Sequence, residues 1–418
     1  MTEIVKPVSE PDKPDAGSHT GEYPTTERGQ FAKLAVLMVT AFIDMIGVLM
    51  ILPLMPFYAT DLGANGLLVG VLVSSFSVAQ LLSAPLWGRF SDKYGRRPAL
   101  LVGLTASAIA YVVFAYADAL WLLFLSRIIQ GAGGGTVSVI QAYVADATRP
   151  QDRAKALGWL SAATNAGVAI GPVIPSLLMG WGSHAPGLMA AGLCVLNMIF
   201  ASKYLVETRK HSEDKHGTVR RTSRSAVLHV LSHPKEPSSR LIQIYAISIG
   251  AFQGTTAVLA LFLAVRFGVT KETIGYFFMY IGVLSVVTRA WLLGKLLDRY
   301  GEAKLSRVGL VLLAAGLVGL SFSKDYVTLA LSVGLMPLGT AFTFPGVTAL
   351  LSKVISSSER GLYMGVQQTY GGITRVAFPP LLGLAFDRLG PQSPFWISAV
   401  IVLGTLLLGR DLERYGRK

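Results

Sequence analysis

The chain has 418 residues, of which 52% are hydrophobic and only 15% are charged, and its formal net charge is +13 at pH 7. Soluble domains contain about 25% charged residues, so this composition excludes an ordinary water-soluble globular protein and indicates a surface that faces lipid. The apolar residues form continuous runs of about 20 residues, which suit membrane-spanning helices and lack the short alternating pattern of a β-barrel.

These runs predict an all-α integral membrane protein with twelve transmembrane helices in two pseudo-symmetric six-helix bundles. The first bundle, 32–206, has helices expected at 32–57, 67–87, 98–117, 119–143, 155–180 and 187–206. The second bundle, 239–409, has helices expected at 239–266, 273–297, 305–323, 326–352, 361–386 and 394–409. The polar segments 1–31 and 410–418 are expected to be tails, the first of them disordered.

The polar segment between the bundles, 207–238, is expected to be a linker. Within it, the sequence SAVLHVL at 225–231 predicts a short amphipathic helix that lies on the membrane face. The linker region also holds four of the six histidines, which are His211, His216, His229 and His233. Because they show no compact ligand spacing, we expect solvated linker residues here and no metal site.

Lysine and arginine are distributed unequally between the two sides of the expected membrane. Of the 37 such residues, 30 lie on the side that holds both termini and the linker, and 4 lie on the opposite side. Positive charge is retained on the cytoplasmic side, so both termini are expected in the cytoplasm and the chain in the cell (inner or plasma) membrane. Contact with anionic lipid then accounts for the basic charge, and no nucleic-acid partner is expected.

A short charged loop, GRFSDKYGRR at 88–97, joins two apolar runs, and a weaker copy, GKLLDRYGEA, lies at 294–303. With their flanks, the two copies resemble the signature loop of the major facilitator superfamily of secondary transporters. The resemblance implies two related halves and a loop that acts as an inner gate latch, holding the outward-open state. Gly95 would permit the tight turn and Asp298 would be the latch residue of the second copy. The alternative is that these charges only set the topology.

The resemblance also assigns roles to other residues of the loop. Gly88 would let the second and eleventh helices approach closely, as small residues do in membranes. Asp92 would meet a helix N-terminus of the other half, where a negative charge is favoured. Arg96 and Arg97 would pair with carboxylates near the inner end of the fourth helix, such as Asp146.

Two charged residues lie deep within apolar runs. Asp44 lies in AFIDMIGVLMILPLMP, and Arg127 lies in LSRIIQGAGGG, which resembles the Arg-x-x-Gln-Gly motif of the same superfamily. A charge there costs at least about 2.5–3.5 kcal/mol unless it meets water or a partner, so we expect Asp44 and Arg127 to pair. Burial favours the protonated carboxyl and a nearby arginine favours the ionised one. The pair could therefore load and release a proton, or it could be a static lock between the first and fourth helices.

The fifth and eleventh helices carry matching interruptions, NAGVAIGPVIPSLL and YGGITRVAFPPLLG. Breaks at matching places in two halves point to a binding site, and Gly171 and Pro172 are expected to kink the fifth helix and help close the inner route. Arg375 in the eleventh helix and Arg127 give a positive interior that suits an anionic or metal-chelated substrate. Other substrate-binding candidates at similar depth are Gln80, Asn165, Gln253, Tyr280, Gln367, Gln368 and Tyr370.

The first half most closely resembles the tetracycline-efflux-like branch of the drug:proton antiporters, in runs such as LWGRFSDKYGRRPALL and ADATRPQDRAKALGWLSA. This implies proton-coupled export of a small organic compound by a monomer in the bilayer, with the compound and protons as partners and no cofactor. One alternative is a uniporter or symporter of a metabolite such as an organic anion. Another is a receptor or assembly protein that does not transport. No nucleophile–base pair or phosphate loop suggests an enzyme.

Overall fold

The computed structural model describes residues 27–149, 151–205, 207, 223–356 and 359–410. The expected tails lie largely outside these residues, as do His211 and His216. The described part of the first half contains α1 (Glu27–Ile51), α2 (Met55–Asp61), α3 (Gly66–Tyr94), α4 (Arg96–Ala115), α5 (Leu120–Ala132), α6 (Thr136–Ala147), α7 (Arg153–Ile170), α8 (Val173–Leu178) and α9 (Ala185–Tyr204).

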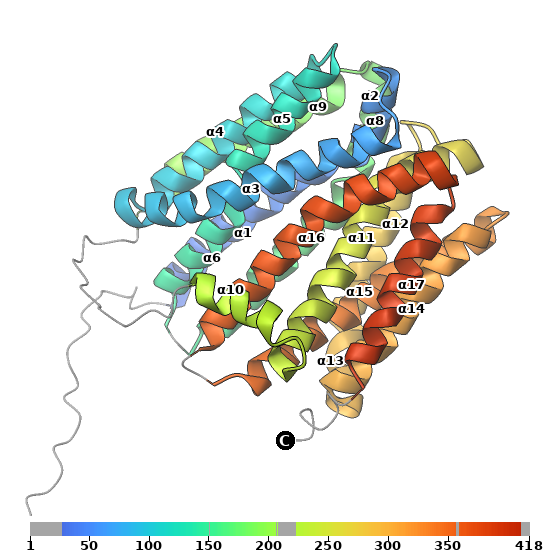
Figure 1. The fold of residues 1–418 in the computed structure, drawn as a ribbon. Coiled ribbons are helices and arrows are strands. Elements are labelled where there is room, and N and C mark those ends of the chain that lie inside the picture. The colour runs from blue at the N-terminus through green and yellow to red at the C-terminus, as the bar shows by residue number, and fades with distance from the viewer. Residues whose placement is uncertain (1–26, 150, 206, 208–222, 357–358, 411–418) are drawn as a thin grey trace, which may run out of the picture.

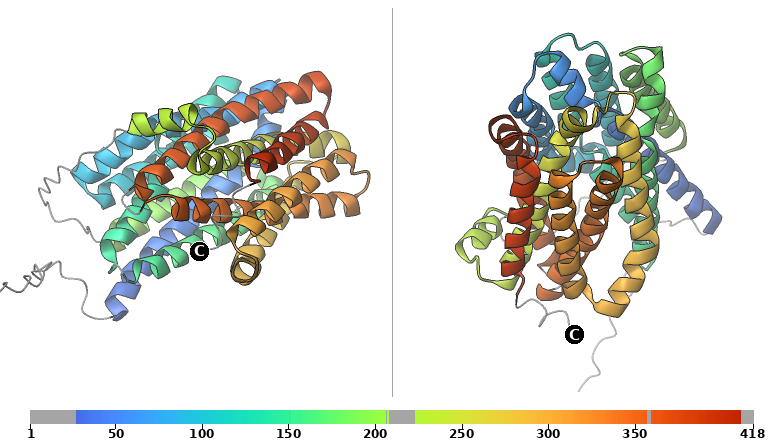
Figure 2. Two further views of the ribbon diagram at one scale, coloured as in Figure 1. Left: turned by 60° about the horizontal axis from the view of Figure 1, so that its bottom comes forward. Right: turned by 90° about the vertical axis from the view of Figure 1, so that its right-hand side faces the viewer.

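The described residues of the second half also form helices. They are α10 (Ser223–Ser232), α11 (Pro237–Phe267), α12 (Ile274–Val287), α13 (Leu293–Tyr300), α14 (Glu302–Phe322), α15 (Tyr326–Val354), α16 (Arg360–Leu389) and α17 (Ser393–Leu408). A π-helical segment, Thr288–Leu292, joins α12 to α13. Figure 2 shows the helices of the two halves, blue to green and yellow to red, as two packed bundles.

Ten helical stretches of the described residues are long and apolar enough to cross a membrane. The 30-residue α16 and the shorter apolar α17 pack among them. Together these elements match the twelve spanning helices expected from the sequence, so the prediction of an all-helical membrane protein is confirmed.

Proline and glycine divide several of the expected spans. α1 ends at Ile51, just before Pro53, because proline lacks the backbone N–H that a helix interior needs. α7 ends at the predicted Gly171–Pro172 kink. The span expected at 119–143 is two helices, α5 and α6, separated by glycines at 133–135. These glycines allow close packing: a Cβ added to Gly135 would lie 2.8 Å from Trp87 Cβ.

The two halves meet mainly through α3 and α16, which lie side by side, and through α7 and α8 against α12 (Figure 1). The α3–α16 contact is closest where α3 begins and α16 ends. A Cβ added to Gly70 would lie 2.6 Å from the Pro379 carbonyl carbon, and one added to Gly383 would lie 2.7 Å from the Gly66 carbonyl carbon. We call this end of the bundle the Asp387 face and the opposite end, where α4 begins, the Arg96 face.

Gly88 does not contribute to this contact. A Cβ added at Gly88 would meet no atom within 4 Å, so the prediction that Gly88 brings the second and eleventh helices together is wrong for this structure. The ribbons of α3 and α16 diverge toward the Arg96 face (Figure 1). The close approach therefore belongs to the opposite end of the same helix pair.

The amphipathic helix expected at 225–231 is present as α10, which packs against α16 and α11. Ala226 and Val230 are buried with 5% and 0% of their surface exposed, whereas Leu228 is 62% exposed. The Tyr370 hydroxyl donates to the Val227 carbonyl at 2.9 Å. This helix of the linker is thus attached to the second half.

Candidate functional site

A central cavity of about 470 Å³ lies between the two halves. Its wall is formed by α1, α3, α5 and α7 of the first half and by α11, α12, α15 and α16 of the second half. Small-molecule sites typically have volumes of about 300–1,000 Å³. Aromatic apolar surface in the wall comes from Phe76, Phe252, Phe278 and Phe344. Because both halves contribute, a movement of one half against the other would change the shape of this cavity.

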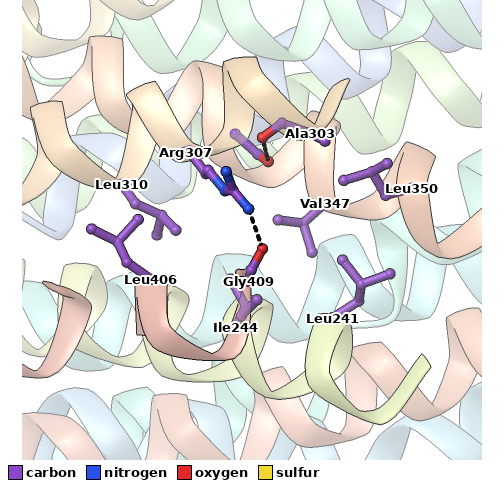
Figure 3. Close-up of a pocket in the computed structure, with 10 residues that line it drawn as sticks. Leu241, Ile244, Ala303, Arg307, Leu310, Val347, Leu350, Leu406 and Gly409 are labelled. Atoms are coloured by element: carbon purple, nitrogen blue, oxygen red, sulfur yellow. Dashed lines mark hydrogen bonds between the residues drawn. The ribbon is translucent and has the colours of Figure 1, made fainter. Parts of the chain in front are cut away.

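A second pocket, beneath Arg307, is far too small for a substrate (Figure 3). Arg307 Nη2 donates to the carbonyl oxygens of Gly409 at 2.6 Å and of Arg410 at 2.7 Å. The guanidinium thereby closes the end of α17. With a volume of about 20 Å³, the pocket has room for a water molecule at most.

Half of the predicted substrate-binding residues line the central cavity: Gln80, Asn165, Gln253 and Arg375. They come from α3, α7, α11 and α16, so the two halves supply two each. Gln80 Nε2 donates to the Gly134 carbonyl at 3.2 Å, and Asn165 Nδ2 donates to the Ser161 carbonyl at 2.7 Å. These bonds hold the two amide groups in place at the cavity wall.

The other four predicted residues do not line the cavity in this structure. Tyr280, which is 40% exposed, and Tyr370 donate to backbone carbonyls of α15 and α10. Gln367 accepts a hydrogen bond from a threonine of α15, and Gln368 donates to a tyrosine of α11. Their depth along the helix was estimated from the sequence, but the face on which each side chain lies was not.

The charged side chains in the cavity wall are all arginines: Arg127, Arg289 and Arg375. The described wall residues include no acidic side chain. Arg289 was not among the predicted binding residues. It lies in the π-helical segment and its Nε donates to Ser285 Oγ at 3.3 Å. Short π segments within α-helices are frequent at functional sites, so Arg289 belongs to the candidate site.

Asp44 and Arg127 are both buried, with 2% and 4% of their surface exposed. Asp44 Oδ2 accepts a hydrogen bond from Thr136 Oγ1 at 3.0 Å. Arg127 Nε and Nη2 are buried and make no hydrogen bond to any residue that the structure describes. The predicted Asp44–Arg127 ion pair is therefore not formed in this structure. An unpaired buried guanidinium is costly, and Arg127 is aimed at the cavity that a ligand could enter.

Tyr111, which the sequence analysis did not single out, connects the surroundings of these two charges. It is fully buried and its hydroxyl accepts a hydrogen bond from Gln130 Nε2 at 2.7 Å. Its ring packs against Gly47, where an added Cβ would lie 3.3 Å away. Gln130 lies about one helical turn beyond Arg127, and Gly47 about one turn beyond Asp44. A buried polar cluster thus joins α1, α4 and α5 behind the cavity.

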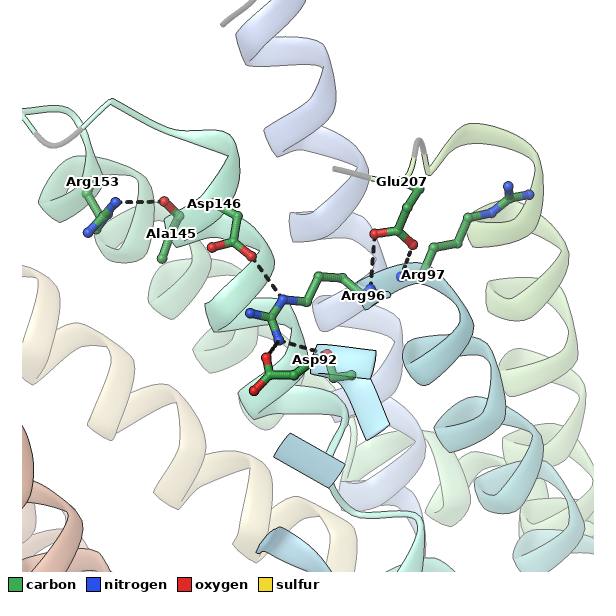
Figure 4. Close-up of polar contacts among 8 residues, drawn as sticks. Asp92, Arg96, Arg97, Ala145, Asp146, Arg153 and Glu207 are labelled. Carbon is green, nitrogen blue, oxygen red and sulfur yellow. Dashed lines mark hydrogen bonds and ion pairs between the residues drawn. The ribbon is translucent and has the colours of Figure 1, made fainter. Parts of the chain in front are cut away.

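The predicted latch loop at 88–97 forms an ion network within the first half (Figure 4). Arg96 Nε lies 2.9 Å from Asp146 Oδ2, as predicted, and Arg96 Nη1 lies 3.0 Å from Asp92 Oδ1. Asp92 was predicted to reach a helix of the other half, and in this structure it pairs with Arg96 instead. Arg97 does not join Asp146, and instead its Nη2 donates to the Ser202 carbonyl.

Glu207 is a partner of this loop that the sequence analysis missed. Its two carboxylate oxygens accept hydrogen bonds from the backbone N–H groups of Arg96 and Arg97, each at 3.0 Å (Figure 4). A carboxylate at a helix N-terminus is favoured by the unpaired N–H groups and the helix dipole. Gly95, with a φ of 103°, makes the predicted tight turn before α4. Glu207 therefore fixes the start of α4 next to that turn.

The second copy of the loop, at 294–303, forms different ion pairs. Asp298 is exposed, and among the described residues no ion pair is formed by it. Instead Glu302, which takes the place of Arg96 in the repeat, lies 2.6 Å from Lys353 Nζ at the end of α15. The pair thus repeats the Arg96–Asp146 contact with the two charges exchanged.

At the Asp387 face, a third motif of the same kind joins the two halves. Gly383, Asp387 and Gly390 repeat the Gly-x-x-x-Asp-x-x-Gly spacing of the two loops, a signal that was present in the sequence and missed. The Asp387 oxygens accept hydrogen bonds from the N–H groups of Gly66 and Leu67, both at 2.8 Å. A second contact between the halves at this face is the Lys271–Asp61 ion pair, joining the α11–α12 loop to α2.

The chain is similar to known membrane transport proteins. The model of the Major Facilitator Superfamily matches residues 37–305 and 244–414. The chain is 26% identical over 374 residues to the class B tetracycline resistance protein of Escherichia coli, which covers 88% of this chain and 91% of that protein. It is 25% identical to multidrug resistance protein 2 of Bacillus subtilis (strain 168), over 88% and 92% of the two chains.

Solved structures with low sequence identity share the fold. The human organic anion transporter MFSD10 (TETRAN) aligns with a TM-score of 0.67 and 22% identity, over 91% of this chain and 99% of that one. A bacterial homologue of the human lysosomal transporter Spinster, in an inward-facing and unoccupied conformation, aligns with a TM-score of 0.76 and 14% identity, over 94% and 98% of the chains.

Proposed function

Since the chain belongs to the major facilitator superfamily, we propose that it exports a small organic compound in exchange for protons, by alternating access. The observation that carries the proposal is the central cavity, which lies between the two halves and receives side chains from both. The names of the curated relatives, tetracycline and multidrug resistance proteins, favour export of a drug-like compound. The fold alone does not fix the substrate or the direction.

The charge of the cavity wall favours a substrate with negative charge. Arg127, Arg289 and Arg375 face a partly enclosed space whose described wall holds no carboxylate. Guanidinium groups bind carboxylates in bidentate fashion, and the aromatic side chains of the wall can stack on a ring. We therefore place an aromatic carboxylate, or a drug bound as an anionic metal chelate, ahead of a lipophilic cation.

The contacts between the halves support a cycle that opens one face at a time. In this proposal the Arg96 face is cytoplasmic, because most lysines and arginines lie on that side. The structure then corresponds to a state that is closed toward the outside, where Asp387 and the Lys271–Asp61 pair join the halves. Opening to the outside requires these contacts to break. The Asp92 side chain, 61% exposed here, would be available to the other half after that movement.

Asp44 is the proposed proton-binding group. Its carboxyl is buried behind the cavity and held by Thr136. A buried carboxylate is costly when ionised and alone, so protonation of Asp44 would change the electrostatic balance with Arg127. An anionic substrate at Arg127 and a proton at Asp44 would each favour a different arrangement of the cluster, which is the coupling that antiport needs.

The test uses purified protein in liposomes that have an acidic lumen and a fluorescent reporter of internal pH. Aromatic carboxylates, tetracycline with Mg²⁺, and lipophilic cations are added to wild type, to Asp44→Asn and to the control Asp118→Asn, which removes an exposed carboxylate. We expect an anionic compound to collapse the gradient in wild type and the control, and not in Asp44→Asn. Uptake without proton movement would favour the uniporter, and no uptake of any compound would favour a receptor or assembly protein.

A further inference from the structure

Three possible metal ligands converge where α10 is joined to α11. His229 lies in the last turn of α10, His233 follows the helix, and Glu236 directly precedes α11. One ligand atom from each residue lies within 4.8 Å of the other two. This differs from the sequence expectation that the linker histidines are solvated and unrelated to one another.

The side chains are already positioned relative to each other. His229 Nε2 lies 3.0 Å from Glu236 Oε2, and the two imidazole rings stack with centroids 4.3 Å apart. His233 Nδ1 contacts Ser232 Oγ at 2.9 Å, which leaves Nε2 as the metal-binding atom of that ring. Each of the three side chains thus has a defined orientation before any cation binds.

We propose that His229, His233 and Glu236 bind a divalent transition-metal cation of the Zn²⁺ class. Two imidazoles and one carboxylate form a ligand set that suits Zn²⁺ and leaves a fourth position for water. The His233 N–H donates to the His229 carbonyl at 2.9 Å, so the helical turn continues to His233 and places the two histidines on the same side. The cation would also lie at the C-terminal end of α10, where the unpaired carbonyl groups favour positive charge.

The site would connect the linker to the transport domain. α10 is held on α16 by the Tyr370–Val227 hydrogen bond, and Val230 is fully buried. Glu236 directly precedes α11, which is a helix of the cavity wall. A bound cation would therefore fix the turn between α10 and α11 at 233–236. Binding at this turn does not depend on which compound the cavity binds.

The test measures Zn²⁺ binding to the tag-free, full-length protein in detergent, by competition with a chromophoric chelator. We expect one Zn²⁺ per chain. His229→Ala and His233→Ala should each weaken binding by about tenfold or more, since each removes a direct ligand. His184→Ala, in which the lost histidine lies at the start of α9, is the matched control and should bind as wild type does. X-ray absorption of the Zn²⁺ complex should show two imidazole ligands.

Two results would overturn the proposal. One is the absence of stoichiometric Zn²⁺ binding in wild type, which would leave the contact between His229 and Glu236 as a simple hydrogen bond. The other is binding that survives in the His229→Ala/His233→Ala double variant and is lost in His211→Ala/His216→Ala, because the ligands would then lie in the part of the linker that precedes α10. Monodisperse elution of every variant during size-exclusion chromatography shows that lost binding is not lost folding.

Discussion

Arg375 places a guanidinium in the wall of the central cavity from α16, the same helix that carries much of the contact between the halves. It is half-buried, so its charge is only partly screened by water. Arg127 and Arg289 add positive charge from α5 and from the π-helical segment. A ligand that carries a carboxylate can therefore compensate charge that the described cavity wall leaves uncompensated.

Replacing Arg375 with glutamine tests whether its charge binds an anionic substrate. A hydrogen bond to a charged group contributes about 1.5–3 kcal/mol, so we expect Arg375→Gln to weaken the apparent affinity for an anionic substrate by about tenfold or more. A neutral analogue of similar size should bind as before. Concentration dependence of uptake into liposomes measures both. Arg388→Gln, which removes an exposed arginine near the end of α16, is the control.

Equal losses for the anionic compound and its neutral analogue would mean that Arg375 acts through the packing of α16 and not through its charge. Unchanged affinity for the anion would remove Arg375 from the binding site. In that case Arg127, whose Nε and Nη2 make no hydrogen bond to any described residue, would remain the first candidate to bind the anion.

For individual residues, the sequence predicts where charges lie better than it predicts which side chains are in contact. Asp44 and Arg127 are conspicuous because a charge within an apolar run is expensive, and both are indeed buried. The sequence could not show that the two side chains do not pair, because the depth of a residue along its helix does not say which helix faces meet. Tyr111 could not be identified from the sequence either, because a tyrosine within an apolar helix is usually an ordinary core residue. Only its hydrogen bond with Gln130 distinguishes it.

The contact between α3 and α16 depends on glycine. Gly70 lies against the Pro379 carbonyl, so this part of the interface is backbone against backbone. Small residues allow such close approach of membrane helices. The Pro379 carbonyl belongs to the backbone of α16. It therefore cannot move aside as the end of a flexible side chain could. Closure of the Asp387 face therefore has little tolerance for added volume at this position.

Alanine at Gly70 should separate the two helices. Overpacking of a tight contact costs about 1–3 kcal/mol, so Gly70→Ala should disfavour the state that is closed at the Asp387 face. We expect a cysteine at Ser77, in the cavity wall, to react faster with a membrane-impermeant maleimide added at that face. Gly192→Ala on α9, whose Cβ would meet no atom within 4 Å, is the matched control and should leave the rate unchanged.

A Gly70→Ala protein that reacts no faster than wild type would show that the α3–α16 contact does not limit access to the cavity from this face. Reaction that is faster in both glycine variants would indicate a general loosening of the first half. The measurement uses Cys194→Ser protein, so that the introduced thiol is the only one in the chain.

The elements follow from the sequence more readily than their interruptions do. Continuous apolar runs identify the spans because the bilayer requires helices of a certain length. Pro53 and Pro172 predict breaks because proline removes a backbone donor. The glycines at 133–135 do not lack a donor, and α5 ends there because Trp87 and the neighbouring α4 pack onto them. Tertiary packing of this kind is not encoded in local periodicity.

The Gly-x-x-x-Asp-x-x-Gly motif occurs at three places in the molecule, and its charged residues have different partners at each. Arg96 pairs with Asp92 and Asp146 inside the first half, and Glu302 pairs with Lys353 inside the second. At the Asp387 face the third motif connects one half to the other. Within the described residues, the charged contacts of the first two motifs stay inside a half. This distribution fits a state whose halves are joined at the Asp387 face and are free to separate at the Arg96 face.

A disulfide across the Asp387 face would test whether the halves must separate there during transport. Lys271 and Asp61 form an ion pair between the halves, so cysteines at the two positions lie on opposite sides of this contact, and a disulfide forms when their Cα atoms approach to about 4.4–6.8 Å. In Cys194→Ser protein, we expect oxidation of the Asp61→Cys/Lys271→Cys variant to stop transport into liposomes and reduction to restore it. Each single-cysteine variant should transport under both conditions, because it can form no intramolecular bond. Full transport by the quantitatively cross-linked protein would mean that this contact persists throughout the cycle, and that access from the outside arises elsewhere than between α2 and the α11–α12 loop.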